Sequence, residues 1–496
     1  MSRTLFAALR DNAAARPDAP AILTEAGAIS HRALLEEVER VATGFAAHGI
    51  GAGDVVAVQL PNIPEFIVTM LAAGARGAIT QTVHMPYRRD ELKTLLGHSG
   101  AKAAIALANG KDHSPAGEIE ALAPDLPALE HVFAVGGSFD DLRANADPSA
   151  LTPAGPDDAY LLLYTSGTTA SPKGVPHPAR GFMQNAADAA AAFGIDGDGR
   201  ILSFAPFTHL YGLMTVHMAV LTGAAAALLP AFAPPAVPGA LKTFRPTVVY
   251  AAPAHFAPLV GSGALSSALF EETRVVSLSG AAVPKRLAAS VDALLPNGSV
   301  IQLWGMSELQ AGAYGRPDDP AEQRLTTTGR PAPGTEARVT EAGALEVRGP
   351  SVFAGYRNNP DETAAAFSHD GWFQTGDTAV IDADGFIRLT GRTKEIINRG
   401  GIKFNPADIE EILLDLPAIA QCAIIPLPDP VLGERACLCA ELHPGAALRL
   451  EDVTARLDKE GVAKFKWPER LEVFDALPIT PTRKVMRGAL AAALRG

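Results

Sequence analysis

The sequence is poor in cysteine and carries no excess of basic residues. Three cysteines among 496 residues are too few for a disulfide framework. Cys437 and Cys439 stand in an apolar run without a nearby His or Cys partner, so we expect reduced core residues and no zinc site. The 54 acidic residues outnumber the 42 basic ones, for a net charge of −12. This balance argues against a nucleic-acid partner, which would require a basic face.

Long apolar segments without interruption are also absent. The apolar run at Leu5 is broken by Arg10 and Asp11, too early for the core of a signal peptide. Residues 201–241 contain no Asp, Glu, Lys or Arg, but histidines and prolines divide them. A membrane helix needs about 20 continuous apolar residues. We therefore expect a cytoplasmic protein without an integral membrane segment, in which this stretch forms core.

The residues that are present have the pattern of a globular α/β chain. Hydrophobic residues make up 48% and charged residues 19%, and the length suggests more than one domain. Helical and strand patterns alternate, which indicates βαβ units and a largely parallel sheet. The expected helices are 32–48 and 64–76, and the expected strands are 55–60, 103–108, 248–251, 274–278 and 300–303.

The pattern changes after about residue 390. Asn405-Pro406 opens a helix that Pro417 ends, followed by strands at 420–425 and 436–442, a helix at 451–460 and a strand at 470–474. We predict an α/β fold with two parts: a large N-terminal α/β domain of several subdomains, residues 1–391, and a small α+β C-terminal domain, residues 392–496.

The strongest local signal is YLLLYTSGTTASPKG at residues 160–174. An apolar strand leads into a loop of small hydroxyl residues, with an approachable backbone at Gly167 and a cation at Lys173. Such a loop can cradle a phosphate. It is not a Walker A loop, because Pro172 stands where that motif needs glycine.

TSGTTASPKG closely resembles the phosphate loop of the adenylate-forming superfamily, which contains acyl-CoA synthetases, carrier-protein-loading adenylation domains and firefly-type luciferases. Further segments resemble this family's motifs in the family's order, over nearly the whole chain. They are Phe207–Gly212, Ser279–Ala282, Trp304–Glu308, Thr375–Asp377, Gly391–Glu395 and Pro478–Lys484.

The resemblance implies that ATP and Mg²⁺ take part. It places ATP against Thr165, Ser166, Gly167, Thr168, Thr169, Lys173, Gly280, Ala281, Ala282, Trp304, Asp377 and Arg392. It makes Glu308 the Mg²⁺ ligand, a hard oxygen donor that suits this ion. Asp377 would accept the ribose hydroxyls, and Trp304 would offer its ring to adenine.

The resemblance also implies three catalytic residues. Lys484 would bridge the substrate carboxylate and the α-phosphate, lowering the repulsion between two anions. Ser307 would contact the same two groups, and His209 would lie beside the acyl pocket.

In this family the C-terminal domain is mobile and rotates between two half-reactions. Lys394 occupies the hinge position, and Gly400-Gly401 would approach the pantetheine arm of coenzyme A. Two departures from the family pattern are Ala170, which replaces the second glycine of the phosphate loop, and Arg483, which replaces the glycine before the catalytic lysine. Leu210 replaces an Asn found in activators of ortho-hydroxybenzoates, which weakens such a substrate assignment.

We therefore interpret the chain as an AMP-forming acid–thiol ligase of the acyl-CoA synthetase type. The alternatives are a stand-alone adenylating enzyme that loads a carrier protein, a nucleotide-binding regulator, and a luciferase-type oxygenase. Retention of Glu308, Asp377, Arg392 and Lys484 together argues against the regulator. A homodimer is one assembly that we leave open.

The acid substrate is predicted only by class. The pocket should draw on residues 209–212, 251–256, 279–282 and 305–306, which contain no acidic residue and no Arg. This disfavours amino acids and malonate, and favours a medium-sized apolar acid that is aromatic, alicyclic or medium-chain. Lys403, Lys464, Lys466 and Arg470 are candidate partners for the phosphates of coenzyme A.

Overall fold

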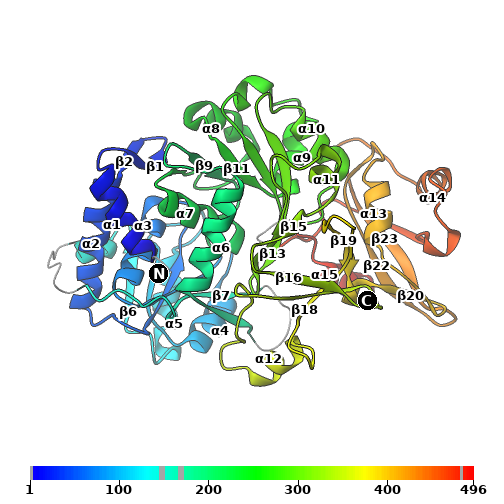
Figure 1. Cartoon of the computed structure of the whole chain (residues 1–496). Helices are drawn as coiled ribbons and strands as arrows, with labels where there is room; N and C mark the ends of the chain where they lie inside the picture. The colour runs from blue at the N-terminus through cyan, green and yellow to red at the C-terminus, as the bar shows by residue number, and fades with distance from the viewer. Residues whose placement is uncertain (1–3, 144–150, 166–171, 481–483, 496) are drawn as a thin grey trace.

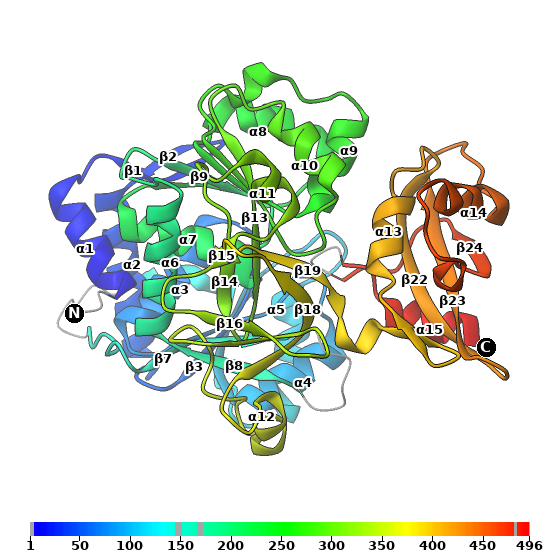
Figure 2. The same ribbon diagram turned by 45° about the vertical axis from the view of Figure 1, so that its right-hand side comes forward.

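The computed structural model describes residues 4–143, 151–165, 172–480 and 484–495. Within them the chain forms an N-terminal part built on three sheets and a smaller C-terminal part built on one, which stands to one side in both views (Figures 1 and 2). The mixed α/β architecture with a large N-terminal and a small C-terminal domain is the predicted fold class.

The first sheet has the strand order β6-β5-β3-β4-β7-β8 among the described residues. Its strands are β3 (Val55–Gln59), β4 (Ile79–Thr82), β5 (Ala101–Leu107), β6 (His131–Val135), β7 (Ala159–Tyr164) and β8 (Gly174–Pro178). All neighbours are parallel except the antiparallel pair β7 and β8. Helices α4 (Arg89–Ser99) and α5 (Pro115–Leu122) cover one face. The strand β8 contains two prolines and lies at an edge, where a missing N–H donor is tolerated.

The second sheet has the order β15-β14-β13-β12-β11-β9-β10-β1-β2 in the part of the chain that the structure describes. Its strands are β1 (Pro20–Thr24), β2 (Gly27–Ser30), β9 (Arg200–Ser203), β10 (Ala225–Ala227), β11 (Val248–Ala251), β12 (Val275–Leu278), β13 (Ser299–Met306), β14 (Gln310–Tyr314) and β15 (Arg330–Pro331). The run from β1 through β10, β9, β11 and β12 to β13 is parallel. The carboxyl ends of β11, β12 and β13 therefore meet at one edge. Helices α8 (Val237–Phe244), α9 (Pro253–Gly261) and α10 (Lys285–Asp292) cover one face.

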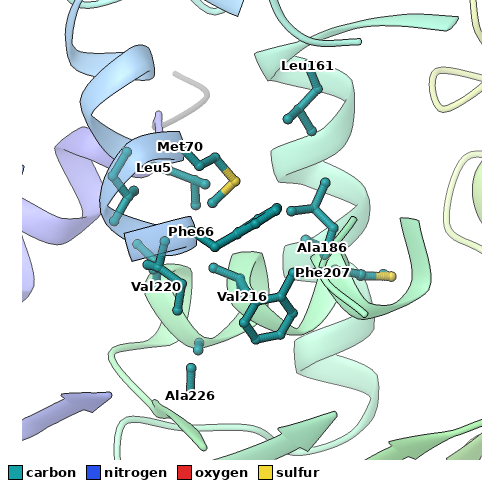
Figure 3. Close-up of a cluster of buried hydrophobic side chains, with 14 of the residues drawn as sticks. Leu5, Phe66, Met70, Leu161, Ala186, Phe207, Val216, Val220 and Ala226 are labelled. Atoms are coloured by element: carbon teal, nitrogen blue, oxygen red, sulfur yellow. The ribbon is translucent and has the colours of Figure 1, made fainter. Parts of the chain in front are cut away.

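The main hydrophobic core lies between these two sheets. It is filled by α1 (Leu5–Ala15), α2 (His31–Ala47), α3 (Pro64–Ala75), α6 (Ala179–Ala192) and α7 (Leu210–Thr222). Figure 3 shows Phe66 of α3 beside Phe207, with ring centroids 5.6 Å apart, and Val216 of α7 in the same cluster. The uncharged stretch is thus buried or half-buried over residues 201–229, as predicted, whereas residues 230, 231, 233, 235, 236 and 239 are exposed. None of the helices within the described ranges is both long and apolar enough to span a membrane.

The third sheet is antiparallel and leads to the C-terminal part. Its order is β16-β17-β18-β19, from strands β16 (Glu336–Val339), β17 (Ala344–Arg348), β18 (Phe373–Ile381) and β19 (Ile387–Arg392). Helices α11 (Ala321–Thr326) and α12 (Pro360–Ala366) precede and interrupt it. Short 3-10 helices are η1 (Ala123–Asp125), η2 (Ser138–Arg143), η4 (Pro234–Ala236), η5 (Ser267–Phe270), η6 (Thr393–Glu395) and η7 (Lys464–Lys466).

The C-terminal part is a sheet with helices on both faces. Its strands are β20 (Ile397–Arg399), β21 (Ile402–Phe404), β22 (Ile419–Asp429), β23 (Gly433–Leu442) and β24 (Arg470–Phe474). Helices α13 (Ala407–Leu413) and α14 (Leu450–Lys459) pack on one face, and α15 (Arg487–Arg495) packs on the other. All three cysteines are buried and free, as expected from their scarcity.

Most of the predicted elements are confirmed to within one or two residues. Two differ more. The helix opened by Asn405-Pro406 stops at Leu413 rather than near Leu416, and Pro406 is its N-cap rather than its first residue. The strand expected at 420–425 runs to Asp429, because a long antiparallel pairing with β23 continues through Pro426 and Pro428. These prolines are tolerated because β22 is an edge strand.

Candidate active site

A tight hairpin between β13 and β14 carries Ser307 and Glu308. Met306 pairs with Gln310 across the turn, and Gln310 has a positive φ of 66°. A Cβ atom on Gly305 would lie 2.0 Å from the Gln310 carbonyl oxygen, so only glycine allows this approach. A left-handed non-glycine residue is costly and persists where its surroundings impose it. The close turn fixes the backbone that presents Glu308.

Asp377 receives donors on both carboxylate oxygens. Trp304 Nε1 donates to Oδ2 at 2.8 Å, and Arg392 Nε lies 3.0 Å from Oδ1. Asp377 and Arg392 face each other on β18 and β19, and Asp377 is only 5% exposed. A buried carboxylate with a donor on each oxygen has a fixed orientation, and each oxygen can still accept a further hydrogen bond. The hydrogen bond from the indole is a role for Trp304 that the sequence motif did not indicate.

Glu308 and Lys173 are connected through a tyrosine that the sequence analysis missed. The Tyr356 hydroxyl donates to Glu308 Oε1 at 2.8 Å, and Lys173 Nζ lies 5.0 Å from the centroid of its ring. Lys173 Nζ also pairs with Glu362 Oε2 at 2.6 Å. Burial and the Glu308 carboxylate raise the pKa of Tyr356, so this hydroxyl keeps its proton.

The ends of the predicted phosphate loop are held together. Thr165 N donates to the Lys173 carbonyl oxygen at 3.3 Å, next to the β7–β8 pair of Tyr164 and Gly174. The loop is therefore the connection of a β-hairpin. Ser166, Gly167, Thr168, Thr169 and Ala170 lie outside the described residues.

Lys484 reaches this site from the C-terminal part. Burial lowers the pKa of its ammonium, as does Arg392, whereas Asp377, Glu395 and Glu308 act to raise it. Of these groups, Asp377 and Glu308 lie more than 100 positions before Lys484 in the chain. The backbone around the lysine forms a closed turn, in which Thr480 N donates to the Lys484 carbonyl oxygen at 2.8 Å. Arg483 lies outside the described residues.

His209 caps the start of α7 next to a second histidine. Its Nδ1 accepts from Tyr211 N at 3.2 Å, and its ring stacks on His84 with centroids 6.3 Å apart. Burial lowers the pKa of His209 to about 3, with smaller contributions from His84 and Lys484. Burial also lowers the pKa of His84 to about 4. Both rings are therefore neutral at pH 7, and His209 offers a polar group without a charge.

The segments predicted for the acyl pocket lie at neighbouring strand ends. Ala251 ends β11, Leu278 ends β12 and Met306 ends β13, and these strands are adjacent and parallel. The carboxyl edge of a parallel sheet is where such folds bind ligands. Gly280 follows β12 with a positive φ of 89°. Ala281 and Ala282, the other predicted nucleotide contacts of this loop, are exposed.

The remaining predicted residues belong to the C-terminal part. Lys394 lies in η6, directly after β19. Gly400 and Gly401 form the turn between β20 and β21, with positive φ values of 59° and 88°. This turn is hydrogen-bonded to the neighbouring turn between β22 and β23, because Gly400 N donates to the Leu432 carbonyl oxygen at 2.8 Å.

No cluster of three metal-ligating side chains occurs among the described residues. Glu308 is a single carboxylate, one of whose oxygens already accepts from Tyr356. Such a donor set fits Mg²⁺, which keeps several waters and takes its other ligands from phosphate oxygens. It does not fit zinc, which protein side chains usually surround.

Comparisons with known proteins show which family the chain belongs to. A family profile described as AMP-binding enzyme matches residues 9–357, and one described as AMP-binding enzyme C-terminal domain matches residues 408–484. A salicylyl-CoA synthase / salicylate adenylyltransferase from Streptomyces sp is 31% identical, over 100% of this chain and 94% of that protein. The medium-chain fatty-acid–CoA ligase of Escherichia coli K12 is 30% identical, over 96% of this chain and 88% of that protein.

A solved structure extends the likeness to three dimensions. The ATP-bound crystal structure of MatB from Rhodopseudomonas palustris superposes with a TM-score of 0.90 and 28% identity, over 100% of this chain and 99% of that one. The two profiles follow the same order as the motifs in the sequence and together cover most of its length. The chain therefore belongs to the AMP-binding enzyme family and is an adenylate-forming enzyme of the acyl-CoA synthetase type.

Proposed function

We propose that the protein uses ATP to activate a medium-sized apolar carboxylic acid and transfers the acyl group to coenzyme A. In the first half-reaction a carboxylate oxygen bonds to the α-phosphorus and the bond to the β-phosphate breaks, releasing pyrophosphate. In the second, the thiol sulfur bonds to the acyl carbon, AMP leaves, and the thiol proton passes to solvent. The observation that carries this proposal is the orientation of Asp377 by Trp304 at 2.8 Å and Arg392 at 3.0 Å. The Lys484 ammonium lies near enough to this carboxylate for Asp377 to raise its pKa.

Each of these residues has a role that its surroundings support. The Lys484 ammonium is suited to lie between the carboxylate and the α-phosphate, because a partly buried cation stabilises anionic charge more strongly than an exposed one. Asp377 is oriented by Trp304 and Arg392 and would accept the ribose hydroxyls. Ser307 stands beside Glu308 in the hairpin turn, where it would contact the α-phosphate.

Mg²⁺ would be held by Glu308 together with phosphate oxygens, and would neutralise charge on the polyphosphate. The protein's own contribution is the fixed turn at Gly305 and the hydrogen bond from Tyr356. ATP, coenzyme A and free cysteines all fit a cytoplasmic location.

We propose that residues 1–391 and 392–496 are separate domains and that the second rotates about Lys394. The last strand of the third sheet ends at Arg392, and η6 then leads into β20. Rotation would withdraw Lys484 and bring the Gly400-Gly401 turn to the thiol. Positive φ values at both glycines give a narrow turn without side chains, suited to a pantetheine arm.

The substrate class follows from the strand ends that would line the acyl pocket. Apart from the buried His255, residues 251–256, 279–282 and 305–306 are small or apolar, and the histidines at 84 and 209 are neutral. By their names, the relatives described above act on salicylate, an ortho-hydroxybenzoate that Leu210 disfavours here, and on medium-chain fatty acids, which belong to the proposed class. A pyrophosphate-release screen across aromatic, alicyclic and medium-chain acids tests this proposal. Turnover confined to amino acids or dicarboxylates would contradict it.

A carrier protein as acceptor is the second candidate, and one observation favours it. Ile402 is 51% exposed and Val431 is 87% exposed. They lie on neighbouring turns, since Gly400 bonds to Leu432. An exposed apolar spot beside the turn that would meet the thiol suits a docking protein. Two of the four cations proposed to bind the phosphates of coenzyme A already have partners within the protein. Arg470 donates to Glu472, and Lys464 lies over the ring of Trp467.

The acceptor is decided by thioester yield with the best acid from the screen. Free coenzyme A is compared with phosphopantetheinylated carrier proteins at equal thiol concentration. Saturable turnover on coenzyme A supports the first candidate. Saturable turnover on a carrier, with none on coenzyme A, supports the second.

A further inference from the structure

Tyr356 touches two charged groups of opposite sign. Its hydroxyl donates a hydrogen bond to Glu308 Oε1 at 2.8 Å, and the centroid of its ring lies 5.0 Å from Lys173 Nζ. Glu308 belongs to the β13–β14 hairpin and Lys173 to the end of the predicted phosphate loop. These segments come from different sheets, so a single side chain spans the two halves of the polyphosphate site.

The backbone that carries Tyr356 is tied to both segments. On one side, Phe353 N donates to the Glu308 carbonyl oxygen at 2.8 Å. On the other, Arg357 N donates to the Gly174 carbonyl oxygen, also at 2.8 Å. The residues between these two hydrogen bonds therefore have fixed distances to the hairpin and to the phosphate loop.

The conformation of Tyr356 is fixed locally as well. Tyr356 N donates to Thr363 Oγ1 at 2.9 Å, and the ring packs against Phe353 with centroids 4.7 Å apart. Gly355 has a φ of 155°, and a Cβ atom there would lie 2.7 Å from Thr363 Cγ2. The tyrosine is thus held in place before any nucleotide binds.

An ammonium and a carboxylate that contact the same side chain attract each other strongly in a partly buried site. If they paired directly, neither would be available to a polyphosphate or its metal ion. In the structure each has another partner: Glu308 has the Tyr356 hydroxyl, and Lys173 has the Tyr356 ring and the partly exposed Glu362. Lys173 can then exchange Glu362 for phosphate oxygens at small cost, because exposed ion pairs are weak.

We propose that Tyr356 is a positioning residue that keeps the Glu308 carboxylate and the Lys173 ammonium apart, each oriented for the incoming ATP. This inference rests on the roles proposed above for Glu308 and Lys173. It requires no titration of the tyrosine, and it concerns the nucleotide-free protein.

Two substitutions separate the hydroxyl from the ring. Tyr356→Phe keeps the ring and removes the hydrogen bond to Glu308. Tyr356→Leu removes both and opens a direct path between Glu308 and Lys173. Tyr314→Phe is the matched control, because the Tyr314 hydroxyl is buried and has no hydrogen-bond partner among the described residues.

The readout is nucleotide binding by calorimetry, first for ATP in EDTA and then for a non-hydrolysable ATP analogue titrated with Mg²⁺. Tyr356→Phe should bind metal-free ATP within about 2-fold of the unmodified protein, yet need roughly 3–10-fold more Mg²⁺. Tyr356→Leu should also bind metal-free ATP about 5–10-fold more weakly, because Lys173 is then engaged by Glu308. Tyr314→Phe should match the unmodified protein in both titrations.

A double variant tests the cause. Adding Glu308→Gln to Tyr356→Leu removes the anion that would capture Lys173, so binding of metal-free ATP should recover. Failure to recover would mean that the leucine acts through general loss of structure, and the inference would be overturned. Unchanged titrations in both single variants would overturn it as well. If the unmodified protein binds no ATP in either titration, the proposed function itself is wrong.

Discussion

Replacing Lys484 by alanine should separate the two half-reactions. The ammonium is the cation that the C-terminal part brings to Asp377 and Glu308, and burial strengthens its action on nearby anions. Removing one preorganised charge-stabilising group typically costs about 2.7–4 kcal/mol of transition-state stabilisation. Adenylation should therefore fall by roughly 10²–10³-fold. Transfer from the acyl-adenylate to coenzyme A should be nearly unchanged, because the proposed domain rotation would withdraw the lysine.

The assay measures each half-reaction alone. Pyrophosphate release reports adenylation, and loss of free thiol after addition of synthetic acyl-adenylate reports transfer. Lys459→Ala, at an exposed position on α14, controls for loss of a lysine in the same domain. An equal loss in both half-reactions would refute the two-conformation reasoning, and so would an unchanged rate of pyrophosphate release.

The environment of Lys484 also predicts a pH effect. Because burial lowers the pKa of its ammonium from the ordinary 10.5, the charge is lost at lower pH than in a free lysine. The rate of adenylation should therefore fall as the pH rises through this lowered pKa, which gives the pH–rate profile an alkaline limb. Lys484→Arg should retain part of the activity and move the limb upward, since a guanidinium stays charged above pH 12. A limb that stays in place would mean that another group titrates.

Three further changes test other parts of the molecule. Glu308→Gln should raise the Mg²⁺ concentration needed for half-maximal activity more than it raises the KM for the acid, because the amide keeps the shape of the carboxylate and loses its charge. Equal Mg²⁺ midpoints for the variant and the unmodified protein would show that Glu308 does not bind the metal. Asp377→Asn should weaken ATP binding by roughly 10–100-fold and abolish any preference for ATP over 2′-deoxy-ATP, whereas a retained preference would contradict the ribose assignment. Burial lowers the pKa of His217 from 6.5 to about 4. Between these two pH values the imidazole binds a proton in the unfolded chain but not in the folded chain. The free energy of unfolding therefore decreases as the pH falls through this range. His217 alone accounts for about 3 kcal/mol of unfolding free energy between pH 4 and pH 6.5. His217→Gln should make the slope of unfolding free energy against pH shallower by nearly one proton at pH 5. An unchanged slope would show that the buried His217 ring does not cause this pH dependence.

The fold was largely predictable because its elements carry local signals. Strand β3 is a short apolar run closed by Pro61-Asn62, and α2 has a clear apolar stripe, so both could be located from the sequence. The length of β22 could not be predicted, since its second half contains two prolines and forms a strand only because β23 pairs with it. Tertiary pairing here overrides a local signal.

The candidate site was predictable where a residue stands inside a motif. Glu308, Asp377 and Lys484 were found through their neighbours in sequence, and their mutual placement required the structure. Tyr356 and His84 were missed because nothing local distinguishes them. The tyrosine matters through contacts with Glu308 and Lys173, and the histidine through stacking on His209. Such roles arise from packing between distant segments.

The separate origins of the two ligand-facing surfaces have a consequence for how such enzymes diversify. The segments proposed for the acid follow β11 and β12, which belong to a parallel sheet covered by α8, α9 and α10. The proposed ribose contacts lie on β18 and β19, in a different and antiparallel sheet. Substitutions at the ends of β11 and β12 can therefore accumulate without disturbing the pairing of Asp377 with Arg392. Acid preference can drift under selection while nucleotide chemistry stays constant, and directed evolution towards a new acid should begin at these two strand ends.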